Sequence, residues 1–253
     1  MTLRTASIAV FGAWSLAACA PMAERPSAAS YAAALADPAR PAADRERDGA
    51  RKPAELLAFA GIVPGQKVGD FAMGGGYLTR LLAVAVGPTG HVYGFQPAEF
   101  IAYRKAYADE QRVVDEAYAN VDAVNGPYAA PPFPAGLDAI VTVQNFHDLY
   151  LKPFLPSDTG ARASKALFAA LKPGGTLLVV DHSAVPGSGT TLSDNLHRID
   201  RQAVIDVLTG AGFRLEASSD LYARPADPRT ANVFDPSIRG QTDQFTLRFR
   251  KPR

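Results

Sequence analysis

Apolar runs with two different spacings alternate along most of the chain. Four short runs have the composition of buried strands: residues 67–71, 91–95, 137–143 and 176–182. Between them, apolar side chains recur every three or four residues, as on one face of a helix. Buried strands that alternate with helices are typical of a parallel sheet covered on both faces. The pattern therefore predicts one α/β domain.

The C-terminal part carries a different strand pattern. Residues 245–250 alternate strictly between apolar and polar side chains, as in an antiparallel strand with one solvated face. Residues 120–124 and 213–221 have the pattern of two further strands. We therefore expect a doubly wound, mostly parallel sheet whose last strand is antiparallel.

Composition and charge narrow the class of partner. The chain has 253 residues, of which 47% are hydrophobic and 20% charged, enough for one large domain. Its 26 Lys and Arg residues nearly balance its 25 Asp and Glu residues. Because this balance gives no strongly basic surface, no nucleic-acid partner is expected.

Residues 1–19 have the pattern of a targeting segment. Arg4 is the only early charge, and residues 8–16 form an apolar run too short to span a bilayer. The run ends in Leu16-Ala17-Ala18-Cys19, which resembles a bacterial lipobox, where the chain is cut before a cysteine that then carries a lipid. The alternative is a chance cysteine upstream of a true start at Met22.

The lipobox interpretation predicts a lipid anchor at Cys19, on the periplasmic side of the cell envelope. Ala20, after the cysteine, resembles the pattern of outer-membrane lipoproteins. Cys19 is also the only cysteine of the chain, so no intramolecular disulfide can form.

A tether and one folded domain are predicted after the signal. Residues 20–43 are rich in Ala, Pro and Ser, with one short helix at 31–36, a composition that buries little surface and suits a tether. The mixed charges of residues 44–48 are expected on a solvated helical face. We place the folded domain at residues 44–253.

The strand at residues 67–71 runs into three glycines, Gly74, Gly75 and Gly76, which open a helix. Glycine lacks the Cβ atom that would keep a ligand away from the backbone, and the first N–H groups of a helix have no internal partner. Carboxylates and phosphates bind such N–H groups. Asp70, at the end of the strand, suits a cationic amine or ribose hydroxyls. A tight turn without a ligand is the alternative.

The turn resembles a known nucleoside-binding motif. Asp70, Gly74 and Gly76 fit the Asp-x-Gly-x-Gly-x-Gly motif of class I S-adenosylmethionine-dependent methyltransferases, and Ala72 replaces its first glycine. Thr79 stands where the dinucleotide fingerprint needs its last glycine, which argues against an NAD-dependent oxidoreductase.

Two more motifs support the resemblance. Leu171-Lys172-Pro173-Gly174-Gly175, leading into an apolar strand, is frequent in that superfamily. The chain also resembles uncharacterised bacterial predicted methyltransferases with a His-Asp pair after the fourth strand, here His147 and Asp148. The resemblance implies a Rossmann-like, doubly wound seven-stranded sheet, mostly parallel with an antiparallel last strand, and S-adenosylmethionine as cofactor.

The resemblance also implies these cofactor contacts: Asp70, Gly74, Gly75, Gly76, Gln96, Asp122 and Asn145. Gln96 follows the second strand, where an acidic residue normally binds the ribose hydroxyls. Its amide could form the same hydrogen bonds, but without charge assistance. Asp122 is expected to meet the adenine amino group, with a surface turn as the alternative. Asn145 follows the fourth strand, beside the donated group.

His147 is the candidate general base, because an imidazole with the ordinary pKa near 6.5 can take a proton near neutrality. Asp148 would orient that ring or cap a helix. His182 and His197 are further candidates, although His197 also fits the start of a helix capped by Asp200. None of the four histidines has metal-ligand spacing, so no metal is expected.

The leading hypothesis is S-adenosylmethionine-dependent methyl transfer to a small molecule by a lipid-anchored, exported protein. The sulfonium of that cofactor is already activated, so the protein mainly has to align a nucleophile with the methyl group. The alternative is a non-catalytic lipoprotein that binds a nucleoside or metabolite. Export from the compartment that makes the cofactor, together with Ala72 and Gln96, keeps this alternative open.

Overall fold

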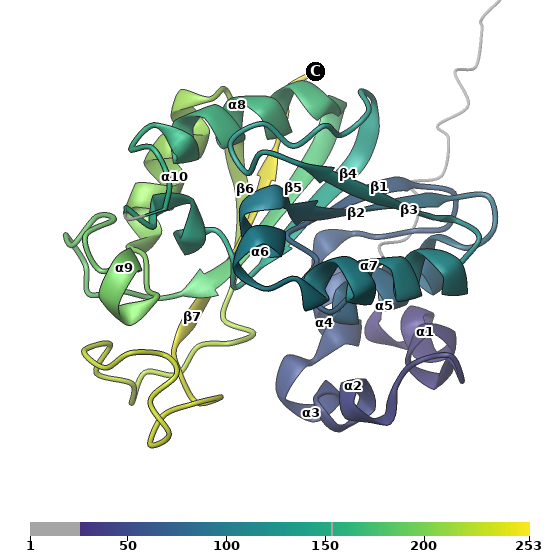
Figure 1. Ribbon diagram of the computed structural model, residues 1–253, viewed down its shortest axis with the longest axis horizontal. Coiled ribbons are helices and arrows are strands. Elements are labelled where there is room, and N and C mark those ends of the chain that lie inside the picture. Colours follow the sequence, from purple (N-terminus) through teal and green to yellow (C-terminus); the bar gives the residue numbers. More distant parts are fainter. Residues whose placement is uncertain (1–25, 153) are drawn as a thin grey trace, which may run out of the picture.

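The computed structural model describes residues 26–152 and 154–253 (Figure 1). The predicted signal segment, Cys19 and the first part of the predicted tether lie outside the described residues. None of the helices in the described ranges is both long and apolar enough to cross a membrane.

The described part of the chain forms one seven-stranded sheet in the order β3-β2-β1-β4-β5-β7-β6. The strands are β1 Lys67–Phe71, β2 His91–Pro97, β3 Val121–Gly126, β4 Leu137–Val143, β5 Leu171–His182, β6 Arg214–Ser219 and β7 Gln244–Arg250. Neighbours among β1 to β5 pair in parallel, whereas β7 is antiparallel to both β5 and β6. The predicted doubly wound, mostly parallel sheet with an antiparallel last strand is confirmed.

Helices cover both faces of this sheet. They are η1 Ala28–Tyr31, α1 Ala32–Ala36, α2 Ala42–Glu46, α3 Asp48–Arg51, α4 Pro53–Ala60, α5 Tyr77–Val86, α6 Ala98–Tyr103, α7 Ala106–Ala117, η2 His147–Tyr150, α8 Thr159–Ala170, α9 Ser193–Leu196 and α10 Arg201–Gly210. In Figure 1, α8 and α10 lie together on one side of the sheet, and α1, α4 and α5 lie on the other.

The alternation of side chains along the central strands divides the core into two parts. In β4, Ala139 and Val141 face a cluster that includes Leu57 of α4 and Leu81 of α5. Ile140, between them, faces a second cluster with the apolar side chains of α8 and α10. Both faces of β4 are therefore buried, which is why its sequence is a continuous apolar run.

The predicted tether is wrong for the residues that the structure describes. η1 packs on α4 and α1 packs on α5, where Tyr31 is only 3% exposed and Ala34 only 1%. The single proton of the Tyr31 hydroxyl is shared between the carbonyl oxygens of Leu57 and Ile62, at 3.0 and 2.6 Å. η1 and α1 are too short to show a periodic apolar pattern, and they are buried through one tyrosine and alanine side chains. Their composition therefore resembles that of a tether. The folded domain already includes Ala28.

The charged run at residues 44–48 is only partly solvated, because Arg45, Glu46 and Arg47 are exposed but Asp44 is buried and Asp48 half-buried. Asp44 pairs with Arg80 at 3.0 Å, and Asp48 pairs with Arg40 at 2.6 Å. Both arginine side chains are buried. The Asp44–Arg80 pair attaches α2 to α5, the helix that follows the glycine turn, whereas the Arg40–Asp48 pair links the N-terminal segments to one another.

Replacing Tyr31 with Phe tests the role of the N-terminal helices. Tyr31→Phe should lower the free energy of unfolding by about 1–2 kcal/mol, because the only donor of this buried interaction is lost and the Ile62 carbonyl is left without its partner. Urea titration would measure the change. Tyr103→Phe is the control, since Tyr103 is 84% exposed and should change stability by less than about 0.5 kcal/mol. Equal stability of both variants would contradict a structural role for η1.

Candidate functional site

The turn after β1 has a left-handed backbone at three positions. Ala72, Gly74 and Gly76 have φ values of 66°, 55° and 80°. Glycine adopts such values at no steric cost, whereas residues with a Cβ atom rarely do. Ala72 therefore takes the backbone conformation that suits glycine, and the turn carries local strain at this residue.

The glycines of the turn have different roles. A Cβ atom on Gly76 would collide with the Val114 side chain of α7, so packing alone requires this glycine. A Cβ atom on Gly74 would meet no atom within 4 Å, and one on Gly75 would only touch Glu110 at 3.5 Å. The space that a ligand could use therefore lies at Gly74.

Side chains from two neighbouring strand ends hold this turn. The Gly74 N–H donates to Oε1 of Gln96, at the end of β2, and Nδ2 of Asn145, after β4, donates to the carbonyl oxygen of Ala72, both at 3.0 Å. Gln96 is fully buried, and its Nε2 has no hydrogen-bond partner in the described part of the chain. An unpaired buried N–H is costly, and a ligand oxygen could accept its hydrogen bond.

Asp70 supports the start of α5 from below the turn. Its carboxylate accepts a hydrogen bond of 2.7 Å from the Thr79 hydroxyl, and the residue is buried. Burial raises the pKa of Asp70 to about 6, although the Thr79 hydrogen bond opposes this shift. Asp70 therefore titrates close to neutrality.

The structure places Asp122 away from the other predicted cofactor residues. It lies near the start of β3, in register with Tyr93, and its carboxylate pairs with His91 at 2.9 Å. His91 begins β2, so this pair marks the amino-terminal edge of the parallel strands, opposite the turn. The predicted strand is correct, but the assignment of Asp122 is wrong. Asn125, in register with Gln96, occupies the carboxyl end instead.

His147 lies between two carboxylates in the interior. Its Nδ1 is 2.7 Å from Oδ1 of Asp181, at the end of β5, and its Nε2 is 3.1 Å from Oδ1 of Asp148. Burial favours the neutral ring, but the charges of Asp148 and Asp181 outweigh burial and raise the pKa of His147 well above its ordinary value. The expectation of a base that titrates near neutrality is therefore wrong, because both ring nitrogens are paired.

The carboxylate of Asp148 is stabilised by the same contact. Burial alone would raise its pKa, but His147 lowers the pKa of Asp148 to about 2. His182, in contrast, faces the Thr242 hydroxyl at 2.9 Å, and burial lowers the pKa of His182 to about 4. His182 is therefore a neutral part of the interior, and not a base of the candidate site.

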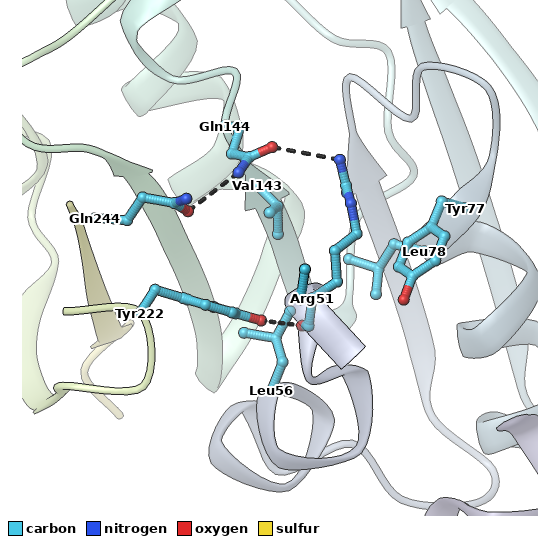
Figure 2. A pocket seen from close by; sticks show the side chains of 9 residues that line it. Arg51, Leu56, Tyr77, Leu78, Val143, Gln144, Tyr222 and Gln244 are labelled. Carbon is cyan, nitrogen blue, oxygen red and sulfur yellow. Dashed lines mark hydrogen bonds between the residues drawn. The ribbon is translucent and has the colours of Figure 1, made fainter. Parts of the chain in front are cut away.

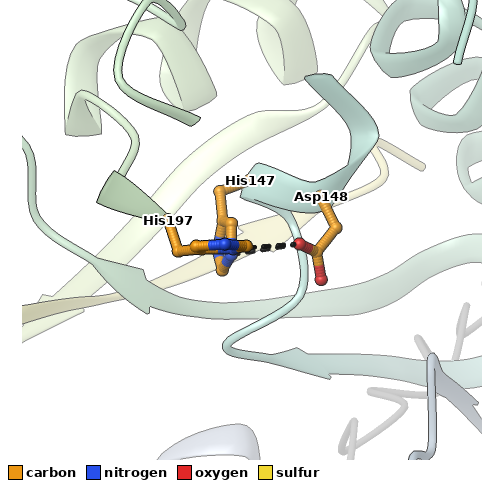
Figure 3. Close-up of side chains that lie close together, drawn as sticks. All are labelled: His147, Asp148 and His197. Atoms are coloured by element: carbon orange, nitrogen blue, oxygen red, sulfur yellow. Dashed lines mark ion pairs between the residues drawn. The ribbon is translucent and has the colours of Figure 1, made fainter. Parts of the chain in front are cut away.

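His197 joins His147 and Asp148, as Figure 3 shows. Its Nδ1 lies 3.8 Å from Oδ1 of Asp148, and its ring meets that of His147 edge-on at 5.4 Å. His197 was a candidate from the sequence, but its contact with His147 could not be predicted, because the two histidines are 50 positions apart along the chain. The only local signal was the polar stretch ahead of α10, where Asp200 caps the helix as predicted by accepting from the Gln202 N–H.

A buried ion pair positions His197. The next residue, Arg198, is fully buried and donates to Asp227 at 2.8 Å and to the carbonyl oxygen of Ser183 at 3.0 Å. His197 itself has a left-handed backbone, with φ of 53°. Because Arg198 turns inward, the neighbouring histidine is directed towards Asp148.

A small cavity lies at the same edge of the sheet (Figure 2). Arg51 of α3, Tyr77 of α5 and Gln144 after β4 contribute to its wall. Nη2 of Arg51 donates to Oε1 of Gln144 at 3.4 Å and so bridges α3 and the strand end. At about 40 Å³, the cavity holds water but not a nucleoside, which needs several hundred Å³.

The chain is similar to known proteins in sequence and in structure. No family model matches the chain. The sequence is 32% identical over 193 residues to the ubiquinone/menaquinone biosynthesis C-methyltransferase UbiE of Ectopseudomonas mendocina. That match covers 76% of this chain and 65% of the length of the relative.

Solved structures with similar folds include several methyltransferases. An S-adenosylmethionine-dependent methyltransferase from Aquifex aeolicus has a TM-score of 0.58 at 19% identity, covering 86% of this chain and 96% of the other. An arsenic(III) S-adenosylmethionine methyltransferase from Chlamydomonas reinhardtii has a TM-score of 0.52 at 16% identity, covering 88% and 73%. The [4+2]-cyclase SpnF has a TM-score of 0.54 at 18% identity, covering 80% of each chain.

The fold of this chain is that of the class I S-adenosylmethionine-dependent methyltransferases. The similarity to a [4+2]-cyclase means that the fold alone does not define the reaction. The reaction has to be inferred from the residues of the site.

Replacing Asp70 with Asn tests the burial of this carboxyl. Its pKa is about 6 in the folded state against an ordinary 3.8. Burial of the ionised carboxylate therefore lowers the free energy of unfolding by about 3 kcal/mol above pH 7 and by little near pH 4, where the folded protein keeps the carboxyl protonated. Asp70→Asn should therefore raise the free energy of unfolding at pH 8 and leave it nearly unchanged at pH 4. Urea titrations at both values would measure this difference, with Asp158→Asn as an exposed control. A gain that does not depend on pH would contradict the buried-charge explanation.

Proposed function

We propose that this protein binds S-adenosylmethionine across the carboxyl ends of β1, β2 and β4 and transfers its methyl group to a small molecule. The observation that carries the proposal is the turn after β1, which is held by Gln96 and Asn145 at its two sides. The similarity to a curated C-methyltransferase supports the same reaction type. A carbon or oxygen nucleophile on a small molecule is the acceptor class that we propose.

The residues at this edge fit a nucleoside with an amino-acid tail. Gly74 leaves open space beside the backbone, where a ligand can approach closely. The buried Nε2 of Gln96 can donate to a ribose oxygen. Backbone N–H groups at the start of α5 can bind a carboxylate, because a helix N-terminus favours negative charge.

The chain's own residues would mainly position the acceptor. S-adenosylmethionine supplies an activated methyl group when bound. Asn145 bonds to the turn and lies just before His147, so the cluster of His147, Asp148 and His197 is beside the cofactor edge. Asp148 and the partly exposed His197 can hold a hydroxyl or carbonyl of the acceptor in line with the methyl group. His147 keeps Asp148 ionised and fixed in place.

We also propose that Cys19 carries a lipid and anchors the domain on the periplasmic side of the cell envelope, in the outer membrane. The support is the apolar run of residues 8–16 and the lipobox-like sequence that ends at Cys19. The folded domain would then lie close to the membrane surface, since α1 follows the anchor closely.

A substitution at Gly74 tests the cofactor site. Gly74→Val should weaken S-adenosylmethionine binding by at least about 100-fold, or about 2.7 kcal/mol, because its side chain would fill the open space. Isothermal titration calorimetry of the purified protein would measure the affinity. Gly61→Val is the matched control, since Gly61 also has a positive φ, of 75°, and open space at its Cβ position. Both variants should strain the backbone to a similar extent, but only the Gly74 variant should lose the ligand.

Two results would overturn the proposed site. Unchanged affinity in a folded Gly74→Val protein would place the ligand elsewhere. Equal loss of affinity in both glycine variants would mean that the effect is general destabilisation. Thermal unfolding of each variant provides the check on folding.

A cysteine variant tests the anchor. Cys19→Ser should move the protein from the membrane fraction to the soluble fraction or leave the signal uncleaved. Mass spectrometry of the wild-type N-terminus should find a lipid on Cys19. A wild-type product that starts at Met1 or Met22 without a lipid would rule out the anchor while leaving the cofactor site untouched.

A further inference from the structure

We propose that His147, Asp148 and His197 form a binding site for a divalent transition-metal ion, for which Zn²⁺ is the best-suited probe. One ligand atom from each residue, the two imidazole nitrogens and a carboxylate oxygen, lies within 4.8 Å of the others (Figure 3). Two histidines and one carboxylate are a ligand set that zinc and iron sites use, with further positions left for water or substrate.

The distances suit one shared ion. Nε2 of His147 and Nδ1 of His197 lie 3.1 and 3.8 Å from the same oxygen, Oδ1 of Asp148. Bonds of about 2.0–2.2 Å to a tetrahedral zinc ion place two of its ligands about 3.3 Å apart. The ring of His147 already stands at that separation, and His197 needs to approach by less than about 1 Å. Its side chain, 26% exposed, is the most exposed of the three.

Asp181 contacts the ring nitrogen of His147 that faces away from the proposed ion, as carboxylates commonly do beside metal-binding histidines. Oδ1 of Asp181 lies 2.7 Å from Nδ1 of His147, and Oδ2 accepts the His147 backbone N–H at 2.7 Å. Oδ1 also accepts the His182 backbone N–H at 2.7 Å. Such a carboxylate holds the proton on Nδ1 and leaves Nε2 with a lone pair directed outward.

This arrangement makes two acceptors face each other. With the Nδ1 proton given to the bond with Asp181, Nε2 of His147 and Oδ1 of Asp148 both present lone pairs across 3.1 Å. Either a second proton or a metal ion has to lie between them. A proton joins only two atoms, whereas three atoms converge here, because His197 approaches the same oxygen. A metal ion satisfies all three.

No competing cation reaches Asp148 within the described residues. Its ion pairs are those with His147 and His197, and the neighbouring Arg198 is taken up by Asp227 at 2.8 Å. The sequence does not reveal this site, because its ligands come from two distant loops, after β4 and before α10, that meet only in the folded chain.

The ion would act on the acceptor of the proposed methyl transfer, and this part rests on that function. An acceptor hydroxyl or carbonyl oxygen could occupy an open coordination position beside the turn, and the ion would then favour loss of the hydroxyl proton to solvent. Metal binding itself does not depend on the cofactor.

Calorimetric titration with ZnCl₂ alone tests the site. The protein is used without a polyhistidine tag, in a Cys19→Ser background so that the thiol cannot contribute, and is first stripped with a chelator. One ion per chain should bind, with a dissociation constant in the micromolar range or tighter. Asp148→Asn and His197→Ala should each weaken binding by more than about 100-fold, since even the loss of an outer-shell partner costs about 10–100-fold.

His91→Ala is the matched control. His91 also pairs with an aspartate, but at the opposite edge of the sheet, so its loss should leave zinc binding unchanged. Replacing Zn²⁺ with Co²⁺ adds an optical readout, in which His197→Ala should lose the absorption bands of the bound ion. Thermal unfolding confirms that each variant folds.

Three outcomes would overturn the metal site: no binding to the wild-type protein, binding that survives both ligand substitutions, or equal loss in His91→Ala. The titration contains no S-adenosylmethionine, and the cofactor titration contains no metal, so either proposal can fail alone.

Discussion

The hydrogen bonds that hold the turn after β1 are the interactions on which the rest of the site depends. A strand that ends in the interior must leave N–H and C=O groups unpaired unless side chains supply partners. Gln96 supplies an acceptor for Gly74, and Asn145 supplies a donor for Ala72. Leaving such a group unpaired costs about 1–3 kcal/mol. The parallel order of β2, β1 and β4 brings both side chains to the turn, so sheet topology fixes the geometry of the cofactor edge.

The second constraint is electrostatic. His147 is buried between two carboxylates, and buried charges are stable only when they are paired and hydrogen-bonded. Asp181 meets this requirement with two backbone N–H groups as well as the ring. The result is a rigid polar group at the ends of β4 and β5, beside the turn. The same contacts fix the positions of Asp148 and His147 relative to each other.

Three of the five non-glycine residues that have a positive φ in the described part of the chain lie at this edge. Ala72, Gln144 and His197 all have a positive φ without being glycine, and they lie in the loops after β1, after β4 and before α10. Residues with a Cβ atom adopt this conformation at a cost, and such residues concentrate at functional sites. Gln144 also contacts Arg51, which links the strained strand end to the N-terminal helices over the cavity. Arg51, on α3, therefore forms part of the wall of this cavity.

The sequence by itself determined the sheet, the glycine turn and the loop that carries Asn145, His147 and Asp148. These depend on local patterns, because burial on both faces and helix capping leave signals within a few residues. Only the tertiary structure decided which distant residues meet. The approach of His197 to Asp148, the pairing of Asp181 with His147 and the position of Asp122 at the opposite edge all depend on strand order and register. The role of Gly76 was hidden for the same reason, since its need for glycine comes from Val114 on another helix.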